Sequence, residues 1–168
     1  MNKRWLFFAL ISTSVLYLYA DMPLPPPADI SVYSENKQYI GISYAKKDKT
    51  VCYQINGNKR KEIWSIKGWN RSFYISDDGN YLIIGYSGLN LLSRDYKPEW
   101  TAISIWCKGK LIRDYQFKDL INDFSKLQET ASHYYWGRII GLNGKILKVN
   151  TVETNLLINI ENLQIVRE

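Results

Sequence analysis

Short runs that alternate apolar and polar residues cover most of the chain after Ala28. Such alternation places the apolar side chains on one face of a strand. Tyrosine (13 residues) and tryptophan (6) are frequent, and aromatic and β-branched residues favour strands. Turn signals such as Asn56-Gly57 and Asn143-Gly144 separate the runs and predict hairpins. The predicted strands are Tyr39–Tyr44, Thr50–Ile55, Lys61–Ile66, Phe73–Ser76, Tyr81–Tyr86, Ala102–Cys107, Leu111–Tyr115, Arg138–Leu142, Ile146–Val149, Asn155–Ile160 and Gln164–Val166.

Two of the strand–turn–strand units resemble each other. Ser34–Tyr44 matches Ser76–Tyr86 at a constant offset, and Gly141–Val149 is a third, weaker copy. A period near 40 with about four strands is typical of propeller blades, which usually number about 4 to 8. We therefore expect a mainly β fold, an antiparallel meander of about three blade-like units that is open propeller-like or sandwich-like. The alternative is chance similarity between hairpins.

The run Phe73–Leu82 contains the turn Asp77-Asp78-Gly79-Asn80. It resembles the opening strand and turn of blades in TolB-like and quinoprotein-like propellers, and also a group of uncharacterised exported bacterial proteins. The resemblance covers roughly residues 73 to 120 and implies a strand pair followed by a short helix. It implies no activity, because Asp and Gly also suit such a turn for local reasons.

Two segments interrupt the strand pattern. One predicts an amphipathic helix from Lys118 to about Thr130, whose apolar stripe packs on a sheet or fits a partner groove. The other, Ser87–Trp100, predicts a long loop, and long loops are often functional. The stripe of the predicted helix consists of Phe117, Leu120, Ile121, Phe124 and Leu127.

The N-terminal segment up to Ala28 indicates export. Lys3 and Arg4 precede an apolar run over Trp5–Ala20, the pattern of a signal peptide. The run is shorter than the roughly 20 residues of a spanning helix. We expect residues 1–20 to be a signal peptide, residues 21–28 a proline-rich spacer or a disordered N-terminus, and residues 29–168 a single β-rich domain. The protein would be periplasmic or secreted; the alternative is an uncleaved N-terminal anchor, the only membrane contact expected.

Charge and cysteine content narrow the choice of partners. The net charge is +6, and +4 without Lys3 and Arg4. That excess is concentrated between Lys46 and Lys61, where it would attract an acidic partner or protect a strand edge from aggregation. So small an excess predicts no nucleic-acid partner. Cys52 and Cys107 are the only cysteines, and in an exported protein they predict one disulfide, with two buried free thiols as the alternative.

Motifs for catalysis or cofactor binding are sparse. The chain has one histidine, and it has no zincin helix, phosphate loop, dinucleotide fingerprint or calcium loop. We therefore expect no metal, no cofactor and no enzymatic activity. Aromatic residues and arginine are typical of hot spots for protein partners. The candidate partner-binding residues are Arg94, Tyr96, Trp100, His133, Tyr134, Tyr135 and Trp136.

These residues favour a non-catalytic interaction protein that binds a protein partner. One version is an immunity protein that neutralises a toxin acting in the cell envelope. The alternatives are a module that binds glycan or another cell-wall polymer through its aromatic residues, a structural subunit of a larger β assembly, and a hydrolase with an unfamiliar site.

Overall fold

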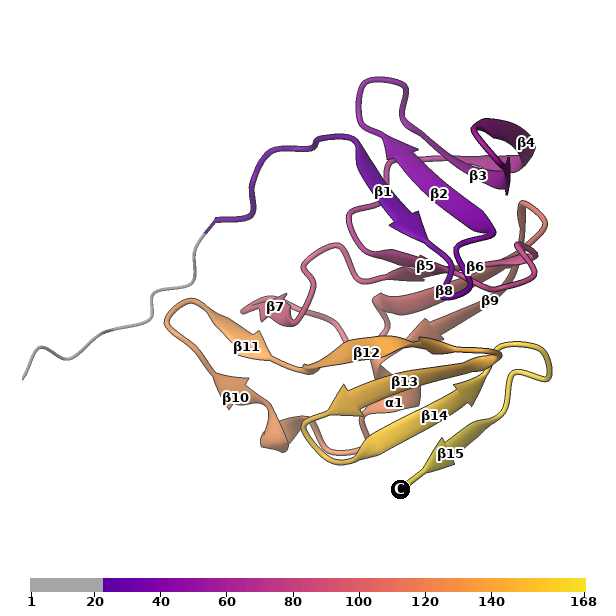
Figure 1. The fold of residues 1–168 in the computed structure, drawn as a ribbon. Helices are drawn as coiled ribbons and strands as arrows, with labels where there is room; N and C mark the ends of the chain where they lie inside the picture. The colour runs from indigo at the N-terminus through magenta and orange to yellow at the C-terminus, as the bar shows by residue number, and fades with distance from the viewer. Residues whose placement is uncertain (1–22) are drawn as a thin grey trace, which may run out of the picture.

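The computed structural model describes residues 23–168, which form three four-stranded antiparallel sheets and one three-stranded sheet (Figure 1). Sheet A contains β1 (Ile30–Tyr33), β2 (Tyr39–Tyr44), β3 (Lys49–Asn56) and β4 (Lys59–Lys67). Sheet B contains β5 (Phe73–Ile75), β6 (Tyr81–Gly85), β8 (Thr101–Cys107) and β9 (Lys110–Gln116). Sheet C contains β10 (Gln128–Glu129), β11 (His133–Tyr135) and β7 (Leu91–Ser93). Sheet D contains β12 (Gly137–Asn143), β13 (Ile146–Thr151), β14 (Asn155–Asn159) and β15 (Ile165–Arg167).

The prediction of a mainly β, antiparallel fold with little helix is thus confirmed, and the sheets of the described chain do not close into a barrel. The predicted signal peptide and the first two residues of the predicted spacer lie outside the described residues. From residue 23 onward, no helix is both long and apolar enough to cross a membrane.

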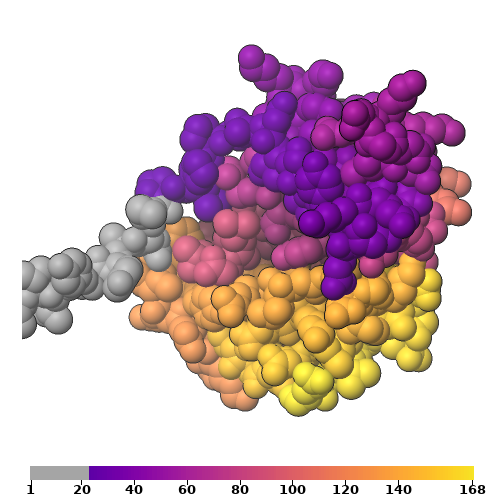
Figure 2. Space-filling view, in the orientation of Figure 1, coloured from indigo at the N-terminus to yellow at the C-terminus, as the bar shows by residue number. Residues whose placement is uncertain are grey.

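Sheet B is the middle layer of a stack, with sheet A on one side and sheet D on the other (Figures 1 and 2). Its inner strands β6 and β8 bury apolar residues because each face of the sheet is covered by another sheet. Leu82 belongs to the cluster shared with sheet A, and its neighbour Ile83 belongs to the cluster shared with sheet D. The stack therefore contains two separate cores, one on each face of sheet B.

The core between sheets A and B depends on a close approach at Gly41 on β2. A Cβ atom at this position would lie 2.7 Å from the Phe73 ring and 2.9 Å from Ile75. Only glycine leaves room for both side chains of β5. The buried members of this cluster are Cys52, Ile66, Phe73, Ile75 and Leu82.

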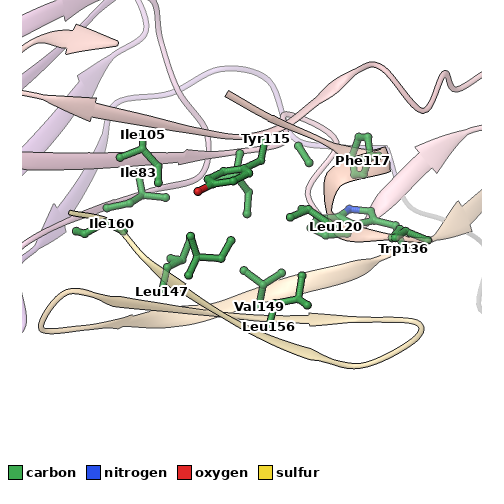
Figure 3. Packing of buried hydrophobic residues seen from close by; sticks show 14 of the residues in the cluster. Ile83, Ile105, Tyr115, Phe117, Leu120, Trp136, Leu147, Val149, Leu156 and Ile160 are labelled. Atoms are coloured by element: carbon green, nitrogen blue, oxygen red, sulfur yellow. The ribbon is translucent and has the colours of Figure 1, made fainter. Parts of the chain in front are cut away.

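The larger core lies between sheets B and D (Figure 3). Tyr115 on β9 is buried among the apolar side chains, and its hydroxyl donates a 2.7 Å hydrogen bond to the carbonyl oxygen of Leu163. That bond satisfies the one polar atom of the ring, as buried tyrosines require. Among the labelled side chains of Figure 3, Ile83, Ile105 and Tyr115 come from sheet B, whereas Leu147, Val149 and Leu156 come from sheet D.

The two segments that match in sequence, Ser34–Tyr44 and Ser76–Tyr86, form the same turn. Ser34 and Ser76 each open a turn, and their hydroxyls accept from the backbone N–H of Tyr39 (3.1 Å) and Tyr81 (2.9 Å). The same serine hydroxyls donate to Asn36 and Asp78 at 2.8 and 2.5 Å. Short polar side chains that bond to nearby backbone favour such turns, so the sequence repeat is also a structural repeat.

Adjacent sheets are connected through these turns. The backbone N–H and the side-chain amide of Asn36 donate to Asp77 Oδ1 and to the Asp77 carbonyl oxygen, both at 2.8 Å. Lys145, in the β12–β13 turn, pairs with Asp78 at 2.5 Å and lies 4.3 Å from the centroid of the Tyr81 ring. We call Asn36, Asp77, Asp78 and Lys145 the turn clasp, because they join sheets A, B and D at one end of the stack.

The turn clasp predicts acid-sensitive stability. Partial burial raises the pKa of Asp78, but hydrogen bonds from Lys145, Ser76 and Asn80 outweigh it and hold the pKa well below its usual range. A lowered native pKa stabilises the fold above the unfolded pKa of about 3.9, and that contribution is lost as the pH falls toward the native pKa.

Asp78→Asn should therefore lower the unfolding free energy at pH 7 by about 1–2 kcal/mol, a modest value because the side chain is 39% exposed. The difference in unfolding free energy between the variant and the wild type should become smaller as the pH falls from about 4 to about 2. Urea unfolding across this range tests it, with the exposed Glu35→Gln as the matched control. An unchanged difference at low pH would contradict the assignment.

The predicted helix from Lys118 to Thr130 is wrong in its extent. The chain forms α1 (Phe117–Leu120), then a 3-10 turn over Phe124–Lys126, then β10. The helix ends because the backbone N–H groups of Asn122 and Asp123 donate to the Glu153 carboxylate at 2.8 and 2.9 Å instead of to helix carbonyls. The apolar stripe still points inward, since all its members but the half-buried Phe124 are buried.

The predicted disulfide is absent, since both cysteines are free thiols. Cys52 faces sheet B from sheet A, in the cluster with Leu82, and burial raises the pKa of its thiol to about 12. Cys107 follows Trp106, whose side chain packs in that same cluster. Successive strand residues point to opposite faces, so Cys107 points toward sheet D. The backbone of sheet B therefore separates the two thiols.

Candidate partner-binding site

The segment predicted as a long loop contains a strand that pairs with the predicted aromatic run. In sheet C, β7 lies beside β11, with Ser93 opposite His133, Leu92 opposite Tyr134 and Leu91 opposite Tyr135. Strand β10 covers the other edge of β11. Sheet C lies at the side of the stack where the described chain begins (Figure 1). Two regions that are distant in the sequence thus form one surface.

Arg94 is the centre of this surface. Its guanidinium donates to Glu129 Oε1 at 2.9 Å and to the carbonyl oxygen of Thr130 at 3.1 Å. Its Cζ atom lies 4.6 Å from the centroid of the Tyr134 ring, a cation–π distance. The Tyr134 side chain and the Glu129 carboxylate raise the pKa of the guanidinium. Arg94 nevertheless remains 44% exposed, so the cation is held in place and still accessible.

Tyr96 extends the surface with a second ring. It stacks on Phe124 with centroids 5.8 Å apart, and it meets Tyr134 edge to face at 5.7 Å. All three rings are half-buried. Such contacts fix ring orientation and contribute about 0.5–1.5 kcal/mol each beyond area burial. Arg94, Tyr96, Glu129 and Tyr134 together are called the Arg94 surface below.

His133 and Tyr135 lie on either side of Tyr134 on β11, and both are half-buried. The Nδ1 atom of His133 is 2.8 Å from the Ser132 hydroxyl. His133 also lines a groove of about 450 Å³ between β7, β11 and the first described residues, Pro23 and Leu24. The groove adjoins the Arg94 surface along β7 and β11, although none of the four residues of that surface lines it.

The proline-rich segment itself is held against the body of the protein. The Arg71 guanidinium donates to the Pro25 carbonyl oxygen at 2.7 Å, and the Trp69 indole N–H donates to the Ala28 carbonyl oxygen at 2.8 Å. Extended proline-rich backbone leaves its carbonyls free to accept such bonds. The described part of the predicted spacer is thus docked at two points.

Two of the candidate residues do not present their side chains as expected. Trp136 is 1% exposed and belongs to the core between sheets B and D, so it supports the surface from below. Trp100 is half-buried, packs against the same core and stacks on Tyr86 with centroids 6.5 Å apart. Their large apolar rings are more stable in the core than in water.

Sequence reasoning missed two members of this region. The Glu129 carboxylate accepts a hydrogen bond that orients Arg94, and the Phe124 ring stacks on the Tyr96 ring. The sequence pattern places both residues in the predicted helix from Lys118 to about Thr130, with Phe124 on its apolar stripe and Glu129 outside that stripe. Both positions depend on where α1 ends, and α1 ends where the Glu153 carboxylate accepts the backbone N–H groups of Asn122 and Asp123. No local sequence pattern indicates this contact.

Within residues 23–168, no group of three or more His, Cys, Asp or Glu side chains could hold a metal ion. Comparisons of the chain with protein-family models, with curated proteins and with solved structures found no match. The resemblance to TolB-like and exported bacterial proteins therefore stays a prediction.

Proposed function

We propose that this protein is a non-catalytic interaction protein that binds a protein partner through the Arg94 surface and the adjoining groove. The observation that supports this most is the state of Arg94, which two hydrogen bonds and a tyrosine ring orient while it remains accessible. Arg and Tyr are the residue types enriched at binding hot spots. A side chain that is ordered before binding loses less entropy on complex formation.

The partner we propose is a toxin that acts in the cell envelope, which would make the protein an exported immunity protein. Neutralising a toxin requires tight binding and no chemistry. The Arg94 surface has mixed charge, with Glu129 beside Arg94, and mixed charge suits specific protein recognition better than attraction to a uniformly charged polymer.

We also infer that the three four-stranded sheets are related to propeller blades. The support is their common meander order, the shared turn of the first two units, and the contacts of β5 with both β1 and β12, the first strands of the neighbouring sheets.

Site-specific photocrosslinking tests the partner surface. A benzophenone amino acid at Tyr96 of the full chain should crosslink one protein in the native cells. The same probe at Tyr33, which is 51% exposed on β1 in sheet A, should not crosslink that protein. Equal crosslinking from both positions, or none from Tyr96, would contradict the proposal.

Arg94→Ala should weaken binding of that purified partner by roughly 10- to 100-fold, because hot-spot arginines contribute about 2 kcal/mol or more. The matched control is Arg113→Ala, since Arg113 also lies over a tyrosine ring, 5.0 Å from Tyr115, but on β9. Titration calorimetry gives both affinities. Equal affinities for the two variants would exclude the Arg94 surface as the binding site.

A further inference from the structure

A cavity of about 240 Å³ lies between sheets B and D, beside the Tyr86–Asn90 segment. Strands β5 and β12, the first strands of their sheets, form its sides through Tyr74 and Ile139. Tyr86 and Trp136 are two further aromatic residues that line the cavity. The cavity is smaller than the roughly 300–1,000 Å³ of drug-sized sites, so it would take a molecule with about one ring.

Arg138 on β12 lines this cavity and is exposed. In the part of the chain that the structure describes, its guanidinium has neither an ion pair nor a hydrogen bond. Arg94, by contrast, is already paired with Glu129. An unpaired guanidinium beside an aromatic cavity can bind a carboxylate through two parallel hydrogen bonds.

Further polar groups line the same cavity. The Ser72 hydroxyl lies where a Cβ on Gly85 would contact it at 3.0 Å, which places it at the wall. Asn90 is a second polar residue of the lining, and its side chain carries an amide. Both can donate hydrogen bonds to an anion. A few convergent polar groups in a mainly apolar cavity are the usual composition of a small-molecule site.

The rim of the cavity is held in a strained conformation. Leu89 has φ of +60°, which is uncommon for a residue with a Cβ and costs of order 1 kcal/mol. The Trp136 indole N–H donates to the Leu89 carbonyl oxygen at 2.8 Å, and the Trp136 backbone N–H donates to the Asn90 carbonyl oxygen at 3.1 Å. These two bonds fix the backbone of the rim at Leu89 and Asn90.

We propose that this cavity binds a small carboxylate with a single apolar ring or a chain of similar size. The carboxylate pairs with Arg138, and the apolar body lies against Tyr74, Tyr86 and Trp136. The inference does not depend on the proposed partner surface, since it uses none of the four residues of the Arg94 surface and only Asn90 lines both this cavity and the adjoining groove. Two sources can supply this chemistry: a free small acid, or the carboxyl terminus of a polypeptide that ends in an apolar residue.

Binding to the full chain is measured by calorimetry and by amide chemical shifts, with benzoate and its neutral analogue benzamide as probes. Benzoate should bind with a Kd of about 1 mM or tighter and shift the amides of Asn90 and Arg138. Benzamide should bind at least roughly tenfold more weakly, because it lacks the charge that Arg138 recognises. Arg138→Gln should remove this preference, whereas Lys148→Gln, an exposed cation on β13, should keep it.

A third probe distinguishes the sources. If a tetrapeptide ending in phenylalanine binds more tightly than benzoate, and its C-terminal amide does not bind, the ligand is a polypeptide terminus; the reverse order indicates a free acid. The proposal is overturned if neither benzoate nor the peptide saturates a site, if benzoate and benzamide bind equally, or if Arg138→Gln leaves the preference intact.

Discussion

Replacing Trp136 by alanine should lower the free energy of unfolding by about 3–5 kcal/mol, the range for removing a large aromatic side chain from a core. The side chain is 1% exposed and meets Phe117 edge to face with centroids 5.1 Å apart. Its indole N–H also donates a hydrogen bond to the Leu89 carbonyl oxygen. The loss thus combines a cavity with an unsatisfied backbone oxygen, and a domain stabilised by about 5–15 kcal/mol would lose a large fraction of its stability.

Two further tryptophan variants separate the contributions. Trp136→Phe keeps an aromatic ring but removes the indole N–H, and it should lose about 1–2 kcal/mol. Trp69→Ala removes a half-buried indole that donates to Ala28 in the proline-rich segment and should lose about 1 kcal/mol or less. Equilibrium urea unfolding gives all three values. If Trp136→Ala cost no more than Trp69→Ala, Trp136 would not be the packed core residue described above.

The strands and their turns could be predicted from the sequence because both are local. Alternation along a short run specifies which face of a strand is apolar. Ser76, Asp78 and Gly79 supply a turn that is closed by local hydrogen bonds between Ser76 and Tyr81. Ser34–Tyr39 forms the same turn without a glycine. The residues that close the turn are shared by both copies, so the repeat can be recognised in the sequence although other residues differ.

The remaining features depend on distant contacts that no local pattern contains. The helix expected up to Thr130 ends after Leu120 because Glu153, far along the chain, accepts the N–H groups that would continue it. The disulfide required Cys52 and Cys107 to point toward each other, which depends on how the sheets stack. Sheet B lies in the middle of the stack, and this places the two thiols on opposite sides of its backbone.

The candidate site, like the fold, could be predicted only in the part that depends on local sequence. Arg94, Tyr96 and Tyr134 could be selected from residue type and loop position, and the structure brings them together. Residue type could not distinguish Tyr134 from Trp136, two positions further along the chain. Tyr134 remains half-buried and in contact with Arg94, whereas Trp136 enters the core. Arg138 could not be selected as a site residue from the sequence, because it lines a cavity that exists only where sheets B and D meet.

Gly79→Ala should cost about 2–4 kcal/mol of stability, the second largest effect. Gly79 has φ of +67°, a region that costs other residues about 1–2 kcal/mol. A Cβ there would also lie 2.3 Å from the ring of Tyr39, on the neighbouring sheet. Overpacking of this kind typically adds about 1–3 kcal/mol. The ring has little freedom to move aside, because it packs at the interface between sheets A and B.

The repeat supplies a matched control, because Lys37 occupies the position of Gly79 in the first turn, with φ of +59°. Lys37 is exposed, and Lys37→Gly relieves the backbone strain while increasing the entropy of the unfolded chain. We therefore expect a change between zero and about 1 kcal/mol, in the stabilising direction. The two turns share backbone geometry, and Lys37→Gly reverses the backbone change that Gly79→Ala makes. The backbone contributions therefore cancel in the sum of the two changes in unfolding free energy, and that sum measures the contact with Tyr39. Urea unfolding of both variants gives the two values. If that sum were near zero, so that Gly79→Ala cost only the backbone contribution of about 1–2 kcal/mol, the turns would not pack between adjacent sheets. The two apolar cores alone would then hold the stack together.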